Sequence, residues 1–258
     1  MSVTAMPLKG IPRIEGFPYM YETHCHSSEA SACARNTAVE MAKAHKEAGY
    51  SGFILTNHNW GGNTAISREL AWGDMLDAFF EPYYLAKEWG DANDFQVLPG
   101  YEAGYKGTEF LIYGIEIEWM HKHPELRDAS VKDQFEIIHS GGGIVVHAHP
   151  FREAFYISRI RLYPEYIDAV EGINAAHCPH LGGEDNSEFN EKALKYAAKL
   201  GMFITGGSDA HNVDLFGGGM AFSERLRDIG DFTDAVVSGR DYRVTDGLHI
   251  YDQRGGLI

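Results

Sequence analysis

Three short segments of the sequence carry pairs of metal-binding side chains separated by one residue. They are His24-Cys25-His26, His147-Ala148-His149 and Asp209-Ala210-His211, and each follows a short apolar or β-branched run. In a strand, residues i and i+2 point to the same face, so each pair can present two ligands to one site. Neutral imidazoles and carboxylates are ligands that borderline divalent cations accept. The repeated spacing therefore predicts a metal centre.

Two further candidates end runs of the same kind. The run GFILT at 52–56 leads to His58, and FQVLPG at 95–100 leads to Glu102. One such residue alone could be an ordinary solvated loop residue. The presence of the whole set at strand ends is poorly explained by that interpretation. The predicted metal ligands at these strand ends are His24, His26, His58, Glu102, His149, Asp209 and His211.

The elements that must position these residues are short apolar strands that alternate with helical patterns. Strands are expected at 17–23, 52–56, 95–100, 109–115, 143–150, 168–174, 202–211 and 219–222, with 109–115 as a possible hairpin partner of the strand before it. Helices are expected at 37–47, 71–90 with an interruption at Pro82, 131–139, 187–200 and 231–238. This alternation predicts an α/β fold with a mostly parallel sheet. A distorted TIM-like (β/α)7 barrel fits better than a doubly wound sheet, because a barrel gathers residues from many strand ends at one rim.

Composition narrows the class of protein. The chain has 258 residues, 44% of them hydrophobic, and shows no repeat or linker, so we expect a single domain over 1–258. Its formal net charge of −15 disfavours nucleic-acid backbones and anionic membranes as partners. The N-terminal segment has no apolar core of a signal peptide, and no run is long enough to span a bilayer. Three cysteines give no disulfide framework, and we expect a reducing, cytoplasmic location.

Six motifs, in chain order, resemble the PHP (polymerase and histidinol phosphatase) family. They are THCH, LTNH, LPGYE, VVHAHP, DAVEGIN and GGSDAH, and they span about residues 20–215. The resemblance implies a distorted (β/α)7 barrel with two or three divalent ions, zinc, manganese or iron, at the C-terminal rim. It also implies which residues hold each ion: His24, His26, Glu102 and Asp209 the first, His58 and His211 the second, and Glu102 with His149 the third.

The sequence departs from the family pattern at two places. Family members often carry an Asp or His seven or eight residues after the first His, where this chain has Ser31 and Ala32. Glu29 is a candidate for the missing oxygen ligand. Glu109 stands where the family often has a His on the following strand. Both changes make the predicted site richer in oxygen, which favours manganese or iron over zinc.

The chemistry expected of such a centre is hydrolysis of a small-molecule phosphoester. Water between two close cations loses a proton near neutral pH and becomes a nucleophile, while the ions neutralise and clamp the phosphate. The planar guanidinium of Arg152, directly after AHPF, is expected to bind a non-bridging phosphate oxygen. His147 and His177 are the candidate proton donors to the leaving alcohol.

Two other readings stay open at this point. Amidohydrolases also use an HxH pair on a TIM barrel, but they usually add a bridging lysine on a strand. The nearest lysine here is Lys106, in the turn-like context YEAGYKGTE. A non-catalytic PHP module that only binds metal is the second alternative. The organic group of the phosphoester and the oligomeric state are not indicated by the sequence.

Overall fold

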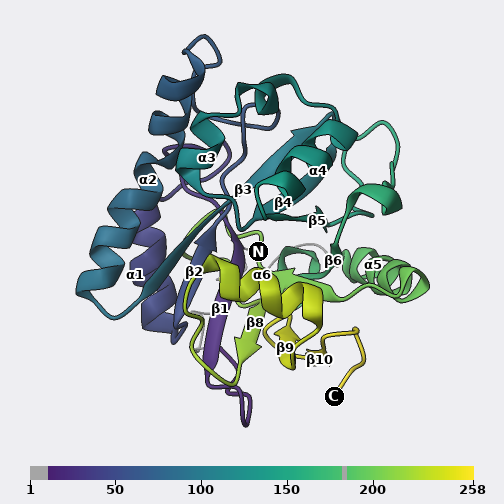
Figure 1. Cartoon of the computed structure of the whole chain (residues 1–258). Helices are drawn as coiled ribbons and strands as arrows, with labels where there is room; N and C mark the ends of the chain where they lie inside the picture. The colour runs from purple at the N-terminus through teal and green to yellow at the C-terminus, as the bar shows by residue number, and fades with distance from the viewer. Residues whose placement is uncertain (1–10, 182–184) are drawn as a thin grey trace, which may run out of the picture.

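The computed structural model describes residues 11–181 and 185–258, and it contains one ten-stranded sheet flanked by helices (Figure 1). The strands are β1 (Tyr19–Cys25), β2 (Gly52–Leu55), β3 (Gln96–Tyr105), β4 (Thr108–Tyr113), β5 (Ile144–Ala148), β6 (Ala169–Asn174), β7 (Ile204–Gly207), β8 (Gly219–Phe222), β9 (Tyr242–Thr245) and β10 (Ile250–Asp252). The α-helices are α1 (Ala38–Ala48), α2 (Trp72–Ala92), α3 (Ile117–His121), α4 (Val131–Ser140), α5 (Ser187–Leu200) and α6 (Ile229–Ser238). Short 3-10 helices cover Pro124–Asp128, Pro164–Tyr166, Ala175–His177 and Pro179–Leu181. The start of the N-terminal segment examined for a signal peptide, residues 1–10, lies outside the described residues.

The sheet mixes parallel and antiparallel pairs. Its strand order is β10-β9-β8-β1-β2-β3-β4-β5-β6-β7. Strands β1, β2 and β3 run parallel, as do β5, β6 and β7, but β4 is antiparallel to both of its neighbours. The predicted α/β class and the predicted β3–β4 hairpin are therefore confirmed. The structure does not show a regular (β/α)7 barrel, because β4 reverses direction and β8 to β10 extend the sheet beyond β1.

The sheet curls so that its last parallel strand returns to the first. The Thr23 hydroxyl on β1 donates a hydrogen bond to the Gly206 carbonyl on β7 at 2.9 Å. Cys25 and Ala210 form an isolated parallel bridge just beyond β7. This contact needs a residue without a side chain, since a Cβ on Gly207 would lie 2.6 Å from the His24 Cβ. The curl brings strand ends that are distant in the sequence to one rim.

Helices cover the outer side of this curled sheet, and most of their ends follow the signals in the sequence. The α1 helix begins with a capping box between Thr37 and Glu40 and ends at Gly49, which has a left-handed φ of 101°. The α6 helix closes the end opposite the rim described below. Its Phe232 ring packs edge-on against Tyr113, with the ring centroids 5.0 Å apart.

Two local predictions differ from the observed elements. The α2 helix continues through Pro82, although proline removes one helical hydrogen bond. Packing outweighs that loss, because Met75, Phe79 and Tyr83 on the same helix are buried. The strands β9 and β10 were not predicted, because each is short and the sequence between them carries no strong alternation. Within the described ranges, no helix is long and apolar enough to cross a membrane.

Replacing Gly207 by alanine tests the close approach between β7 and β1. The added methyl would lie 2.8 Å from the His24 backbone nitrogen, so the strands must separate. We expect the free energy of unfolding to fall by about 1–3 kcal/mol, as for other overpacked cores. Chemical denaturation measures the change.

Gly73→Ala is the matched control for this substitution. A Cβ at Gly73, in α2, meets only His121 Nδ1 at 3.6 Å, which is ordinary contact. Alanine also favours a helix over glycine, so stability should stay unchanged or rise by up to about 1 kcal/mol. Equal stability of Gly207→Ala and the unmutated chain would contradict the packing described.

Candidate metal centre

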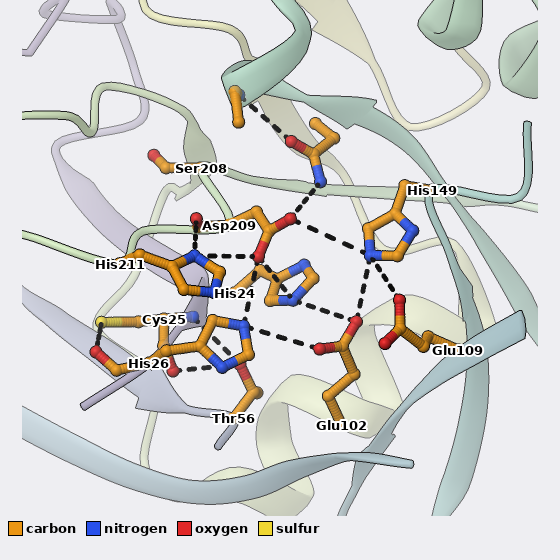
Figure 2. A network of polar contacts seen from close by, with 12 residues as sticks. His24, Cys25, His26, Thr56, Glu102, Glu109, His149, Ser208, Asp209 and His211 are labelled. Carbon is orange, nitrogen blue, oxygen red and sulfur yellow. Dashed lines mark hydrogen bonds and ion pairs between the residues drawn. The ribbon is translucent and has the colours of Figure 1, made fainter. Parts of the chain in front are cut away.

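The C-terminal ends of the parallel strands form one rim, and the predicted ligands meet there. Figure 2 shows all of them except His58. They come from the end of β1 and the residue after it, from the segments after β2, β5 and β7, and from within β3. Their ligand atoms fall into overlapping groups within 4.8 Å: His26 with His58 and His211, His24 with His26 and Asp209, His24 with Glu102 and His149, and His58 with Glu102 and Glu109. The seven predicted strand-end ligands and Glu109 thus share one site.

The two imidazoles at the end of β1, His24 and His26, are each oriented by a partner of the Nδ1 atom. His24 Nδ1 lies 2.7 Å from Glu171 Oε1, and His26 Nδ1 lies 3.2 Å from the Ser31 hydroxyl. Ser31 in turn donates a hydrogen bond to Asn57 Oδ1. Each ring therefore directs Nε2 into the cluster. Metal-binding histidines are usually held in this way, with the second nitrogen on a fixed partner.

Two buried carboxylates lie between the rings. Glu102 Oε1 is 3.0 Å from His149 Nε2, and Asp209 Oδ1 is 3.2 Å from His26 Nε2. Burial raises the pKa of a carboxyl group, but the imidazoles His24 and His58 hold the pKa of Glu102 well below its usual range. The pKa of Asp209 is likewise well below its usual range, because His24 and His26 outweigh burial. Both side chains are anionic and attract cations.

The backbone is strained at two of the ligands. His149 has a φ of 26° and Asp209 a φ of 54°, in the left-handed region that non-glycine residues seldom adopt. At Asp209 this conformation lies where the chain leaves β7 and turns along the rim. Strain of this kind persists only where the surrounding structure fixes it, and it concentrates at functional sites.

His211 and His58 lie on the side of the cluster that faces the loop after β1. His211 Nδ1 is 2.7 Å from the Asp209 carbonyl oxygen, and its Nε2 is 3.1 Å from the sulfur of Cys33. The His58 ring lies beside that of His211, with the ring centroids 5.9 Å apart. Burial raises the pKa of the Cys33 thiol, but the hydrogen bonds with His211 and His58 lower it to about 6. Sequence reasoning missed Cys33 as a site residue.

The unpaired buried atoms of the cluster indicate that it fits divalent ions. Within the described part of the chain, five buried atoms of the cluster have no hydrogen-bond partner: His24 Nε2, His26 Nε2, His58 Nδ1, Glu102 Oε2 and Asp209 Oδ1. His58 Nδ1 and Glu102 Oε2 approach to 2.7 Å without the direction of a hydrogen bond. Buried polar atoms rarely stay unpaired, and these converge on shared space. The residues fit bound cations.

Arg152 and Glu109 lie together at the edge of the cluster. Arg152 Nη2 is 2.5 Å from Glu109 Oε2, and its Nη1 is 3.3 Å from Asp209 Oδ2. Burial lowers the pKa of a guanidinium, but Glu109 and Asp209 raise that of Arg152 above its usual value, so it stays charged. Glu109 is also grouped with His58 and Glu102, as the sequence predicts for a residue near the ions.

Glu29 is not brought to the cluster. Its carboxylate accepts hydrogen bonds from the Ala38 amide at 3.1 and 3.2 Å, at the start of α1. This position is favourable for an anion, because the first amides of a helix lack partners within the helix. The expected use of Glu29 as a metal ligand is therefore not supported by where it lies.

The structure places the two candidate proton donors, His147 and His177, differently relative to the cluster. His147 pairs with Phe110, which alternates with Glu109 along β4 and so faces the other side of the sheet. The His147 ring stacks on Phe110 at 5.0 Å, and burial with the charge of His149 lowers its pKa to about 3. The structure thus turns His147 away from the cluster. His177, by contrast, lies next to His149, with ring centroids 6.4 Å apart.

Glu171 and Glu22 have roles that the sequence reasoning did not assign. Glu171 Oε1 holds His24, and its Oε2 accepts the His149 amide at 2.8 Å. Glu22 Oε1 accepts the amides of His24 and Ser208, both at 2.8 Å. Both are acidic residues within short apolar strands. That unusual placement was the signal that could have identified them.

Comparison with known proteins supports the same fold. A family model, PHP_C (PHP-associated), matches residues 187–240, from α5 to α6. Among solved structures, a two-domain protein from Bacteroides vulgatus containing a predicted PHP-like metal-dependent phosphoesterase is similar, with a TM-score of 0.63 and 14% identity over 94% of this chain and 69% of that one. PsfC from Pseudomonas syringae gives 0.55 and 17% over 83% and 87%. No curated protein matches. The PHP resemblance is confirmed.

Metal binding by this cluster predicts a large gain in stability when ions are added. Chelator-treated protein should take up about two or three equivalents of zinc, cobalt or manganese by elemental analysis. At about 100-fold excess over the dissociation constant, binding to the folded state alone adds about 2.7 kcal/mol per ion, seen as a higher melting temperature.

His58→Ala and His121→Ala separate the cluster from ordinary histidines. His121 pairs with exposed Asp77, away from the rim, so its loss should leave metal uptake unchanged. His58→Ala should lower the uptake and the thermal shift. Uptake below about one equivalent in the unmutated chain would contradict the proposed centre.

Proposed function

We propose that the chain is a metal-dependent hydrolase that cleaves a small-molecule phosphoester. The observation that carries this proposal is the convergence of imidazoles and two anionic carboxylates whose buried atoms lack other partners. A purely structural cluster would satisfy its own donors and acceptors, since unpaired buried polar atoms are costly. The PHP-like fold supports the same class of reaction.

The residues present suit more than one divalent ion. Following the resemblance, His24, His26, Glu102 and Asp209 would hold the first ion, His58 and His211 the second, and Glu102 with His149 the third. The overlapping groups of ligand atoms support such a division, with Glu102 shared. Bound divalent ions generate a nucleophile from water near neutral pH and neutralise phosphate oxygens. Zinc, manganese and iron are the candidates.

Arg152 supplies the fixed positive charge for the phosphate. Glu109 and Asp209 hold its guanidinium from two sides, at 2.5 and 3.3 Å. A planar fork fixed in this way can bind a phosphate oxygen with little loss of side-chain freedom. A neutral amide or ester substrate gains less from such a group. We therefore infer a phosphoester rather than a C–N or C–O substrate.

His177 is the candidate for moving a proton to the leaving alcohol. Its Nδ1 lies 3.2 Å from Asn190 Oδ1, and the Asn190 amide nitrogen donates to the Asn174 carbonyl. Asn190 thus presents an acceptor, so His177 Nδ1 carries the proton and Nε2 the lone pair. Burial and the nearby His149 lower the pKa of His177 to about 4. The neutral ring can accept and return one proton at Nε2.

Substitution of single ligands tests the reaction. Asp209→Asn and His26→Ala should each lower the turnover of a phosphoester by at least about 100-fold, because both residues would fix the ions. The fold should persist, since rim residues contribute less to stability than the packed interior. Circular dichroism and thermal unfolding check the fold, and a phosphate-release assay checks the rate.

Cys25→Ala is the control for these two substitutions. Cys25 lies between the two ligands of β1 but is fully buried beside Thr56 and Ala210. Most of the activity should remain in this variant. Activity lost in Cys25→Ala and kept in Asp209→Asn would point to a thiol nucleophile and overturn the proposal.

Arg152→Lys tests the class of substrate. Lysine keeps the charge but loses the fork, so we expect KM for a phosphomonoester to rise by about tenfold. A metal-loaded screen over mononucleotides, histidinol phosphate, sugar phosphates and short oligonucleotides should first identify a substrate. Hydrolysis of amides or lactones alone would favour the amidohydrolase reading. Metal uptake without any turnover would favour a non-catalytic module.

A further inference from the structure

An exposed thiol lies against one of the imidazoles in the candidate centre. Cys33 is in the loop between β1 and α1, and its sulfur is 3.1 Å from His211 Nε2. His58 belongs to the same part of the site, because its ligand nitrogen lies within 4.8 Å of that of His211. The nitrogens of His26, His58 and His211 form one of the groups that can hold an ion. The thiol therefore stands at the open side of that group.

The tautomer of His211 shows what its Nε2 can bind. His211 Nδ1 lies 2.7 Å from the Asp209 carbonyl oxygen, which only accepts hydrogen bonds. In the neutral ring Nδ1 therefore carries the proton, which leaves the lone pair of Nε2, on the side of Cys33, available to an ion. A tetrahedral zinc ion would set sulfur and nitrogen about 3.5 Å apart. The observed 3.1 Å needs only a small separation of the two side chains.

The loop that carries Cys33 is fixed on both sides. The Ala32 amide donates to the Asn63 carbonyl, and the Arg35 amide donates to the His211 carbonyl, both at 2.9 Å. These bonds attach the loop to the segments that follow β2 and β7. Cys33 is therefore held between the two segments that supply His58 and His211, and its position does not depend on a flexible loop.

We propose that Cys33 is a ligand of the ion bound by His58 and His211, so that one ion of the centre has a thiolate ligand. This inference rests on the proposed function. It explains the first departure from the family pattern, because Cys33 lies one residue beyond Ala32, where the pattern ends. Ser31 is engaged with His26 and Asn57, and Glu29 with α1. Neither competes for this place.

A thiolate with two imidazoles changes the expected metal. Soft sulfur ligands favour zinc, iron or cobalt over manganese and magnesium. The sequence reasoning, which counted Glu29 and Glu109 as added oxygen ligands, favoured manganese or iron. With Cys33 in place of Glu29, this ion is expected to be zinc or iron.

Cobalt absorption tests the inference independently of activity. We would titrate chelator-stripped, full-length protein with cobalt(II) under anaerobic conditions. The unmutated chain should show a near-ultraviolet sulfur-to-cobalt charge-transfer band, and Cys33→Ser should lose it while its cobalt affinity falls at least about tenfold. Cys33→Asp should bind the ion without the band. Because Cys33 is exposed, both variants are expected to fold.

Cys178→Ser is the control, since Cys178, His180 and Asp246 form a separate group that includes a thiol. The band should persist in this variant. A band unchanged in Cys33→Ser, or lost in Cys178→Ser, would overturn the assignment of Cys33 while the proposed hydrolase stands. If the unmutated chain bound no cobalt at all, the proposed function would fail together with the inference.

Alkylation gives a second readout. Zinc should protect Cys33 from iodoacetamide in the unmutated chain, as followed by mass spectrometry of the Cys33 peptide. His211→Ala should remove that protection. Equal labelling of Cys33 with and without bound zinc would contradict coordination by sulfur.

Discussion

The burial of two negative charges, on Glu102 and Asp209, is the constraint around which the rim is arranged. Moving an ion out of water costs several kcal/mol unless partners compensate it. The imidazoles of His24, His26, His58 and His149 and the guanidinium of Arg152 supply part of that compensation. The unpaired atoms that remain face one another across the same space. Divalent ions bound in this space would neutralise the remaining negative charge and pair with these atoms.

That arrangement requires other residues to hold the rings in place. Glu171 contacts the ring of His24 and the backbone of His149, and so links β1 to the segment after β5 through β6. Glu22 joins β1 to the segment after β7 in the same way. The pKa of Glu22 is raised to about 7, because it is fully buried, although these amides favour its charged form. The geometry of the centre thus depends on acids that do not reach the candidate ligand groups.

Different ends of the fold provide the apolar packing and the candidate site. The interior of the curled sheet and α6 pack large side chains such as Tyr113 and Phe232 at the end away from the rim. The rim instead contains strained backbone at His149 and Asp209 and charged groups such as Arg152. Strain and buried charge are tolerated at one end because apolar packing elsewhere stabilises the chain. This division leaves residues at the rim free to differ from the family pattern, as Glu109 does.

The sequence by itself determined the class of fold and most of the cluster. Hydrophobic periodicity, turn residues and helix caps are local features of the sequence. They were therefore sufficient to predict the strands before His24, His58 and Asp209, and helices such as α1 and α5. The pairing of β4 with β3 was also visible as a hairpin. Spacing at strand ends indicated the seven candidate ligands that the structure brings together.

Only the tertiary structure decided which residues of each pair face the rim. Alternation suggested that His147 and His149 act together, but the pairing of His147 with Phe110 places it on the other side of the sheet. Glu29 and Cys33 lie in the same loop, and their roles depend on contacts with α1 and with His211. Such contacts join segments up to 178 residues apart in the sequence. No local pattern encodes them, because they arise from the curl of the sheet, which brings distant loops to one rim.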